Sequence, residues 1–249
     1  MRIAVIADIH GNAQALDAVL AKIREAGPDL TVCLGDIVGY GANPGYCIAR
    51  LRETTEVVVA GNHDKDISNG ASSPGTNPIA RLLQDWTRHN LNEEELHYLS
   101  ELPNRVVDSE EFVAVHGCYL NDVHVTGYVT STMLETNLHS IADREEWPAL
   151  AFCGHTHIPL CGWIDRGTFI EQKLKTPIQW SARAQAVLIN PGSVGQPRDG
   201  DPRAAFALID TRQCTAEVIR IDYDIKGAAR AIEISGLPMI LAERLHQGR

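Results

Sequence analysis

The first part of the chain alternates short apolar runs with segments of helical periodicity. Apolar residues dominate the runs 3–7, 30–34 and 57–60, which is the pattern of strands that are covered on both faces. Apolar residues recur at helical spacing over 12–26, and Asn43-Pro44 predicts the start of a second helix. This order of strands and helices predicts a parallel sheet with right-handed crossovers.

A polar loop and two further helices follow. Residues 68–77 are rich in Gly, Ser, Asn and Pro, and they predict a loop. Asn77-Pro78 predicts the cap of one helix, and Asn92 with its three following glutamates predicts another. The first of these helices has a predicted apolar face formed by Ile79, Leu82, Leu83 and Trp86.

From about residue 104 the chain changes to short strand candidates separated by turn residues. They are 106–107, 112–115, 150–153, 162–164, 187–189, 204–209 and 216–221. We predict that they form a second, largely antiparallel sheet, followed by closing helices over 224–234 and 238–247. Without a repeat or a linker in the sequence, we predict one α/β domain over residues 1–249, in which two packed sheets are flanked by helices.

Composition narrows the possible partners. The net charge of −10 disfavours long nucleic acid and anionic membranes, although bound divalent metals would reverse the sign locally for a small anionic substrate. The apolar start reaches Asp8 too soon for a signal peptide, and no apolar stretch approaches the roughly 20 residues of a membrane span. Six scattered cysteines are typical of reduced core residues. We predict a cytoplasmic protein, and a homo-oligomer stays open.

Five polar clusters each follow an apolar run, so their side chains are expected at the ends of strands, along one edge of a sheet. They are Asp8-Ile9-His10, Gly35-Asp36, Gly61-Asn62-His63-Asp64, His116-Gly117 and Gly154-His155-Thr156-His157. Asp, Asn and His in this mixture are hard to borderline metal ligands. The clusters together therefore predict a two-metal site.

Taken singly, most of these clusters have an ordinary structural explanation. Asp8 and His10 are also common in helix caps and turns, Gly-Asp pairs are common in turns, and a single His after a strand is usually only hydrogen-bonded. The adjacent His63-Asp64 pair suits a proton donor oriented by a carboxylate, or an Asx-turn with a solvent-facing histidine. The order and placement of all five favour the metal site over coincidence.

In this order the clusters resemble the calcineurin-like metallophosphoesterase superfamily. The resemblance covers about residues 1–160, and the stretch Asn190-Pro191-Gly192-Ser193-Val194-Gly195-Gln196-Pro197-Arg198 is similar to the ending of the small bacterial and archaeal phosphodiesterase branch. The resemblance implies an α/β fold, a four-layer α/β/β/α sandwich of two mixed sheets flanked by helices.

The resemblance also implies a role for each residue of the clusters. One metal ion would be held by Asp8, His10, Asp36 and His157, and the other by Asp36, Asn62, His116 and His155. His63 would protonate the leaving group with Asp64 orienting it, while a hydroxide that bridges the metals attacks the phosphorus. The implied cofactors are two divalent transition metal ions, Mn, Fe, Ni, Co or Zn, with Mn favoured.

Residues outside the clusters give weaker signals. Ser193 and Arg198 lie in a Gly/Pro-rich loop, and they are candidates for holding a substrate phosphate or for a structural turn. His124 and Tyr128 follow the fourth cluster in a segment without periodicity. They are candidates for the substrate pocket, but surface positions are the more expected outcome.

These observations predict a metal-dependent phosphoric ester hydrolase, most simply a phosphodiesterase for small or nucleotide-like diesters. The alternatives are a phosphomonoesterase that uses the same site, and a non-catalytic metal-binding scaffold such as the retromer subunit of this fold. That scaffold branch has lost the catalytic histidine or several ligands, whereas His63 and all seven ligand positions are present here. The residues after Gly35-Asp36 lack the Asp-Arg-Gly of the diadenosine tetraphosphatase and protein phosphatase branches, which counts against both.

Overall fold

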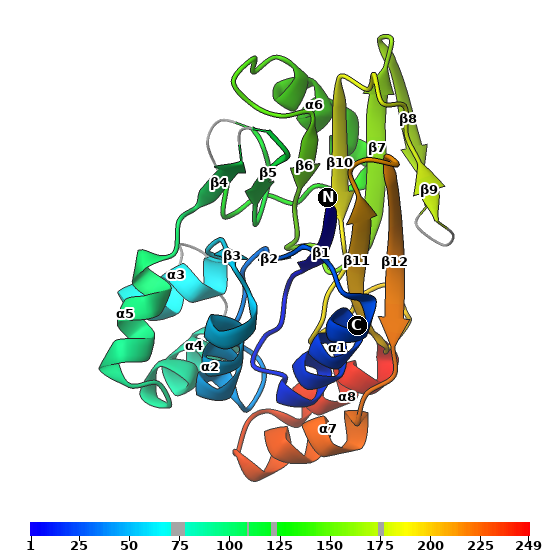
Figure 1. Cartoon of the computed structure of the whole chain (residues 1–249). Helices are drawn as coiled ribbons and strands as arrows, with labels where there is room; N and C mark the ends of the chain where they lie inside the picture. Colours follow the sequence, from blue (N-terminus) through cyan, green and yellow to red (C-terminus); the bar gives the residue numbers. More distant parts are fainter. Residues whose placement is uncertain (71–77, 109, 121–123, 174–176) are drawn as a thin grey trace.

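Two mixed β-sheets form the centre of the computed structural model, which describes residues 1–249 except 71–77, 109, 121–123 and 174–176 (Figure 1). The first sheet has the strand order β3-β2-β1-β11-β12-β9. Its strands are β1 (Arg2–Ile6), β2 (Leu30–Cys33), β3 (Val57–Val58), β9 (Ile178–Gln179), β11 (Ala204–Asp210) and β12 (Thr215–Ile221). The strands β1, β2 and β3 are parallel as predicted, and the other neighbours in this sheet are antiparallel.

The second sheet has the strand order β4-β5-β6-β10-β7-β8. Its strands are β4 (Arg105–Asp108), β5 (Phe112–Val115), β6 (Leu150–Phe152), β7 (Leu160–Asp165), β8 (Thr168–Gln172) and β10 (Ala186–Asn190). The central strands β5, β6 and β10 are parallel, and the outer pairs are antiparallel.

Three of the five pairings in the second sheet are antiparallel as predicted, although its centre is parallel. The prediction that all the late strands join this sheet was wrong, because the hairpin β11–β12 belongs to the first sheet, where Val5 of β1 pairs with Ala207 of β11. Strand β11 is apolar on both faces and fits beside a strand of either sheet, so its sequence does not specify which sheet it joins.

Helices cover the outer faces of the two sheets. They are α1 (Ala13–Ala26), α2 (Pro44–Thr54), α3 (Asn62–Asn69), α4 (Pro78–His89), α5 (Glu93–Glu101), α6 (Ser131–Ala142), α7 (Ile225–Ile234) and α8 (Met239–Gln247). One apolar cluster joins α1 and α2 to the first sheet, a second fills the space between the sheets, and a third joins α6 to the second sheet. This order of layers confirms the predicted α/β/β/α sandwich.

The helices α3 and α6 were not predicted from the sequence, and α4 buries a different face from the predicted one. Leu83 of α4 is buried as expected, but Ile79 and Leu82 are 56% and 54% exposed. The buried face is completed by the polar residues Gln84 and Thr87, because Gln84 donates a hydrogen bond to the Asp66 carboxylate of α3. The first residues of the predicted loop 68–77 end α3, which Gly70 caps, and residues 71–77, with the Asn77 cap, lie outside the described residues.

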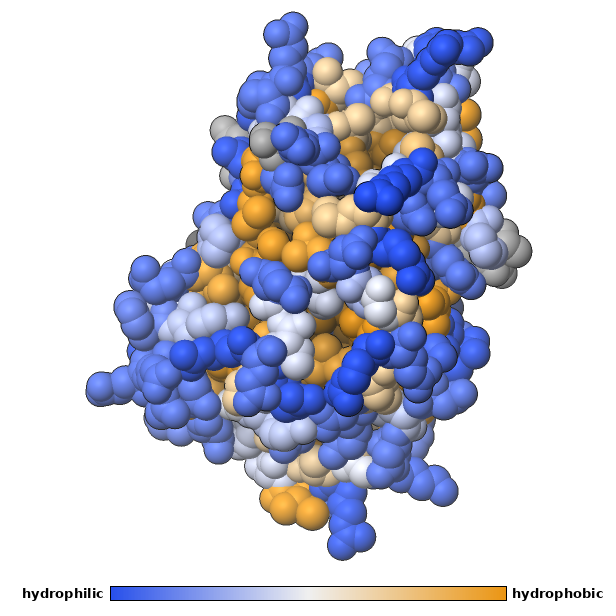
Figure 2. Space-filling view, viewed as in Figure 1, coloured by the Kyte–Doolittle hydropathy of each residue, from blue (hydrophilic) through white to orange (hydrophobic). Residues whose placement is uncertain are grey.

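The surface is mainly polar. Hydrophilic side chains cover most of the face shown in Figure 2, and apolar ones gather toward its middle. All six cysteines are free thiols, five of them buried, as expected for core residues. Among the described helices, none combines the length and the apolar character that crossing a membrane requires.

We expect the layer between the sheets to dominate stability. Phe152 of β6 is fully buried there, with its ring centroid 5.3 Å from that of Phe112. Phe152→Ala should lower the free energy of unfolding by about 3–5 kcal/mol, because it leaves a cavity between two sheets. The control Ile234→Ala, at a side chain that is 74% exposed, should change it by less than about 0.5 kcal/mol. Urea unfolding followed by circular dichroism measures both, and equal effects would contradict this account of the core.

Candidate metal centre

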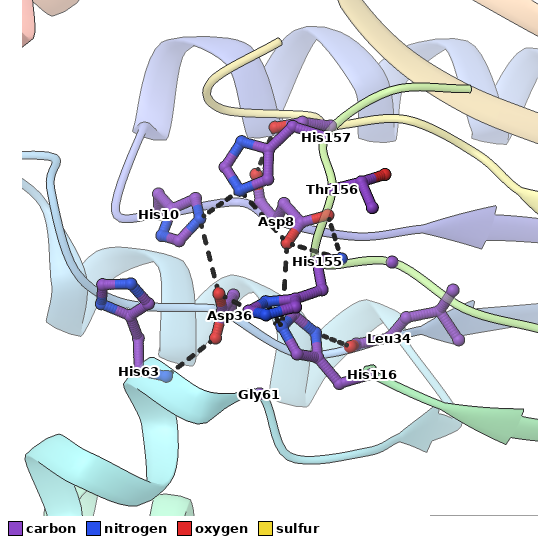
Figure 3. Close-up of polar contacts among 12 residues, drawn as sticks. Asp8, His10, Leu34, Asp36, Gly61, His63, His116, His155, Thr156 and His157 are labelled. Carbon is purple, nitrogen blue, oxygen red and sulfur yellow. Dashed lines mark hydrogen bonds and ion pairs between the residues drawn. The ribbon is translucent and has the colours of Figure 1, made fainter. Parts of the chain in front are cut away.

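The loops that follow β1, β2, β5 and β6 converge at one end of the two sheets, where the start of α3 joins them (Figure 3). Each loop carries one or two residues of the predicted clusters. Two groups of side chains result. The ligand atoms of Asp8, His10, Asp36 and His157 lie within 4.8 Å of one another, and so do those of Asp36, His116 and His155. All six of these residues are buried.

Asp36 is the residue that the two groups share. Its Oδ2 atom lies 3.6 Å from Nε2 of His10 in the first group and 3.3 Å from Nε2 of His116 in the second. Its other oxygen, Oδ1, accepts a hydrogen bond from the backbone N–H of His63 at 2.9 Å. One carboxylate thus connects both groups and holds the start of α3 beside them.

Backbone carbonyl groups orient three of the histidines. Nδ1 of His10 lies 3.2 Å from the Val38 oxygen, that of His116 lies 2.7 Å from the Leu34 oxygen, and that of His157 lies 2.5 Å from the Gln196 oxygen. An Nδ1–H that donates to a carbonyl leaves the Nε2 lone pair free, which is the usual arrangement around a metal-binding imidazole.

The donor atoms fit divalent cations. The Nε2 atoms of His10 and His157 face each other at 3.1 Å, and Nε2 of His116 faces Nδ1 of His155 at the same distance. Two lone pairs at such a distance are stabilised by a cation between them. Asn62 adds a further donor, because its Oδ1 atom is buried without a hydrogen-bond partner. Such an orphaned oxygen costs about 1–3 kcal/mol unless it is bound.

The backbone around the ligands is strained. Of the described residues other than glycine, eight have positive φ, and five of these are Asp8, His10, Asp36, His155 and His157. Each such residue costs on the order of 1–3 kcal/mol and persists only where the surrounding structure fixes it. Strain of this kind is typical of functional sites.

A glycine permits the close approach of α3 to the second loop. A Cβ atom at Gly61 would lie 2.1 Å from Oδ1 of Asp36 and 2.2 Å from its backbone nitrogen. Any side chain at this position would therefore push Asp36 away from His63. This requirement accounts for the Gly in the third cluster.

The two carboxylates of the centre differ in charge. Burial, with the help of the neighbouring Asp36, raises the pKa of Asp8 to about 7 against the opposing effect of His116. Burial acts on Asp36 in the same direction, but His116 and His63 outweigh it, and the pKa of Asp36 lies well below its usual range. Asp36 is therefore the fixed anion of the centre.

The histidines of the two ligand groups also differ in their protonation. Burial lowers the pKa of His155 to about 3 and holds the pKa values of His10 and His157 well below their usual range, so these rings are neutral ligands. Burial would also lower the pKa of His116, but Asp36 and Asp8 outweigh it and raise this pKa to about 9.

His63 lies beside the ligands and outside both groups. Its ring centroid is 5.0 Å from that of His10 and 4.6 Å from that of Tyr40. Its Nδ1 atom is buried without a hydrogen-bond partner and packs on Gly39, where a Cβ would lie only 2.6 Å from it. Burial lowers the pKa of His63. No pattern in the sequence marks Tyr40 as a neighbour of this residue.

The Asp64 carboxylate bonds to backbone groups and not to the His63 ring, which it was expected to orient. Its Oδ1 atom accepts hydrogen bonds from the backbone N–H groups of Ile37 and Val38, and its Oδ2 atom accepts one from Gly61. The turn of α3 directs the carboxylate back toward these backbone groups, whereas His63 points the other way. Burial raises the pKa of Asp64 to about 7. Asp64 thus acts on His63 only through the backbone that it anchors.

Of the two candidates for phosphate binding, the structure brings one to the site surface. Ser193 is fully buried, and its hydroxyl donates to the Asp8 carbonyl at 2.7 Å and accepts from the Gln196 N–H at 2.8 Å, so it is a loop anchor and not a substrate contact. Arg198 is half-buried, and its guanidinium donates to the Gln196 side chain at 2.8 Å and lies over the Tyr40 ring.

The two residues after the fourth cluster occupy different environments. His124 is buried, with Nδ1 3.2 Å from the Cys118 oxygen and Nε2 3.0 Å from Arg105, so the expectation of a surface position was wrong for it. Tyr128 is exposed as expected, yet its ring stacks on that of His155, with centroids 4.1 Å apart and planes at 21°.

Comparison with known proteins matches the chain to one family and to a relative of similar length. Residues 1–214 match the calcineurin-like phosphoesterase superfamily domain. The chain is 35% identical over 249 residues to an uncharacterised protein from Methanocaldococcus jannaschii, covering 99% of this chain and 98% of that protein.

Two crystal structures are similar over the full length. A metallophosphoesterase from Sphaerobacter thermophilus is 35% identical with a TM-score of 0.84, covering 100% of this chain and 99% of that one. A hypothetical protein from Pyrococcus horikoshii OT3 is 24% identical with a TM-score of 0.78, covering 100% of this chain and 98% of that one, and this likeness concerns the fold alone.

We expect cation binding to displace protons from the centre. In the metal-free protein Asp8 and His116 have pKa values of about 7 and 9, so both carry protons that a cation must remove near neutral pH. The affinity for Mn²⁺ should therefore rise as the pH increases from 6.5 to 8.5. Titration calorimetry in two buffers of different ionisation enthalpy should show proton release at pH 7. Equal heats in both buffers, with a pH-independent affinity, would contradict this assignment.

Proposed function

The chain belongs to the calcineurin-like phosphoesterase superfamily, and on that premise we propose that it is a phosphodiesterase acting on small or nucleotide-like diesters with two divalent metal ions. The observation that carries the proposal is the pair of ligand groups joined at Asp36, with His63 held beside them but outside both. A binding scaffold needs no such histidine, whereas hydrolysis needs a proton for the leaving oxygen.

The residues divide into two sets of metal ligands. Asp8, His10, Asp36 and His157 would hold one ion, and Asp36, Asn62, His116 and His155 would hold the other, with Asp36 common to both. Divalent ions bound there supply Lewis-acid stabilisation of the phosphoryl oxygens and lower the pKa of water. The nitrogen and oxygen donors suit Mn, Fe, Co, Ni or Zn, among which we propose Mn.

His63 is the proposed proton donor. Its Nδ1 atom is closed off by Gly39, which leaves Nε2 as the nitrogen that can reach a leaving-group oxygen. Burial lowers the pKa of this ring, but the negative charge of a bound phosphoester acts in the opposite direction and favours the protonated form. The backbone bond from His63 to Asp36, and that from Gly61 to Asp64, fix the position of the ring.

Arg198 is the proposed contact for a phosphoryl oxygen. Its guanidinium lies over the Tyr40 ring, which packs on the rings of His10 and His63, and this position beside the ligands supports the proposal. A guanidinium beside the metal ligands can donate hydrogen bonds to the phosphoryl oxygens of a phosphodiester.

We expect the Mn²⁺-loaded protein to hydrolyse bis-p-nitrophenyl phosphate faster than p-nitrophenyl phosphate. His63→Ala should lower kcat by roughly 10²–10⁴-fold, the usual contribution of a general acid, without changing the metal content. The matched control is His89→Ala, which removes an exposed histidine of α4 and should leave kcat unchanged.

The outcomes separate the competing functions. Wild-type turnover in His63→Ala would remove the acid role from this residue. Faster hydrolysis of the monoester would assign a phosphomonoesterase. No hydrolysis of either ester with Mn, Fe, Co, Ni or Zn would assign a scaffold.

Arg198→Ala should raise KM for the diester by about tenfold or more, because a hydrogen bond between charged groups contributes about 1.5–3 kcal/mol. Arg198→Lys should restore part of the loss, since it keeps the charge but not the planar donor geometry. The control is Arg203→Ala, whose side chain is 45% exposed and pairs with Asp201 in the same region of the chain. A KM that is unchanged in Arg198→Ala would place the phosphate contact elsewhere.

A further inference from the structure

An exposed tyrosine covers one of the proposed metal ligands. The Tyr128 ring lies nearly parallel to that of His155 at 4.1 Å, although 55% of the Tyr128 residue surface is exposed. One ring face rests on His155, and more than half of the residue surface is exposed to solvent. A large aromatic side chain kept open at the edge of a binding site is suited to contact with a ligand.

The chain holds this tyrosine firmly in place. The Gly117 N–H donates to the His124 carbonyl at 2.6 Å, which ties the segment before Tyr128 to the loop after β5. Gly127 lies against Cys118, since a Cβ there would be 2.4 Å from the Cys118 sulfur. On the other side Val129 is buried in the apolar cluster beneath α6. The backbone is thus anchored before and after the exposed ring.

Aromatic rings border both ligand groups. Tyr40 packs on the rings of His10 and His63, with centroids 4.7 and 4.6 Å away. The Arg198 guanidinium lies over the Tyr40 ring, 5.9 Å from its centroid. Tyr40 thus borders the first group at His10, and Tyr128 borders the second group at His155.

We propose that Tyr128 determines specificity by stacking its exposed ring on an aromatic ring of the substrate, a nucleobase or an aryl group attached to the phosphoryl group. This inference rests on the proposed function and names the substrate class of that same site. Stacking between an aromatic side chain and a base tolerates any base, because every base has a π face. The competing explanation is that Tyr128 only supports the His155 ring.

The test compares two product-like ligands that differ in the base. Adenosine 5′-monophosphate and ribose 5-phosphate are titrated calorimetrically into the Mn²⁺-loaded protein, without any turnover. The wild type should bind the nucleotide about tenfold more tightly, the effect of one stacked base. Tyr128→Ala should remove this preference and Tyr128→Phe should keep it. Tyr46→Ala, which removes a tyrosine that is 44% exposed on α2, is the matched control and should keep it as well.

The following results would overturn the stacking role of Tyr128. Equal affinity of the wild type for both ligands, or an undiminished preference in Tyr128→Ala, overturns the stacking role while leaving the phosphoesterase proposal intact. Failure of the wild type to bind either ligand overturns the proposed function and the stacking role together. An equal loss for both ligands in Tyr128→Ala, with less metal found by elemental analysis, assigns Tyr128 to supporting His155 and overturns specificity.

Discussion

The shared carboxylate of Asp36 is the contact on which the rest of the centre depends. Its Oδ2 atom faces His10 on one side and His116 on the other, and its Oδ1 atom holds the N–H of His63. Its negative charge raises the pKa of His116 and of Asp8, so it also sets the protonation state of its neighbours. Without this residue the two ligand groups would have no common member, and His63 would lose its anchor.

The fold makes this contact possible by bringing both sheets to one edge. The loops after β1 and β2 carry Asp8, His10 and Asp36, while the loops after β5 and β6 of the other sheet carry the histidines of the second group and His157 of the first. The absence of a side chain at Gly61 lets α3 start against Asp36, and the Asp64 carboxylate fastens that start to the loop after β2. The stability of the layer between the sheets is therefore a condition for the geometry of the site.

Much of this arrangement was predictable from the sequence, because metal ligation admits few residue types and the strand ends are marked by apolar runs. The contacts of Asp64 were not predictable. An adjacent His-Asp pair does not reveal that the first turn of α3 separates the two side chains. The stacking of Tyr128 on His155 was not predicted either, because it depends on how Gly127 packs on Cys118 within the connection from β5 to α6. The sheet that receives β11 and β12 is likewise decided by tertiary contacts alone.

The central claim is that Asp36 joins two metal sites, and anomalous X-ray diffraction from crystals grown with Mn²⁺ tests it most directly. We expect two anomalous peaks on either side of the Asp36 carboxylate, one beside His10 and His157 and the other beside His116 and His155. In crystals of Asp36→Asn both peaks should weaken, because the shared negative charge is gone. A single peak in the wild-type protein, or two peaks that Asp36 does not contact, would contradict the account.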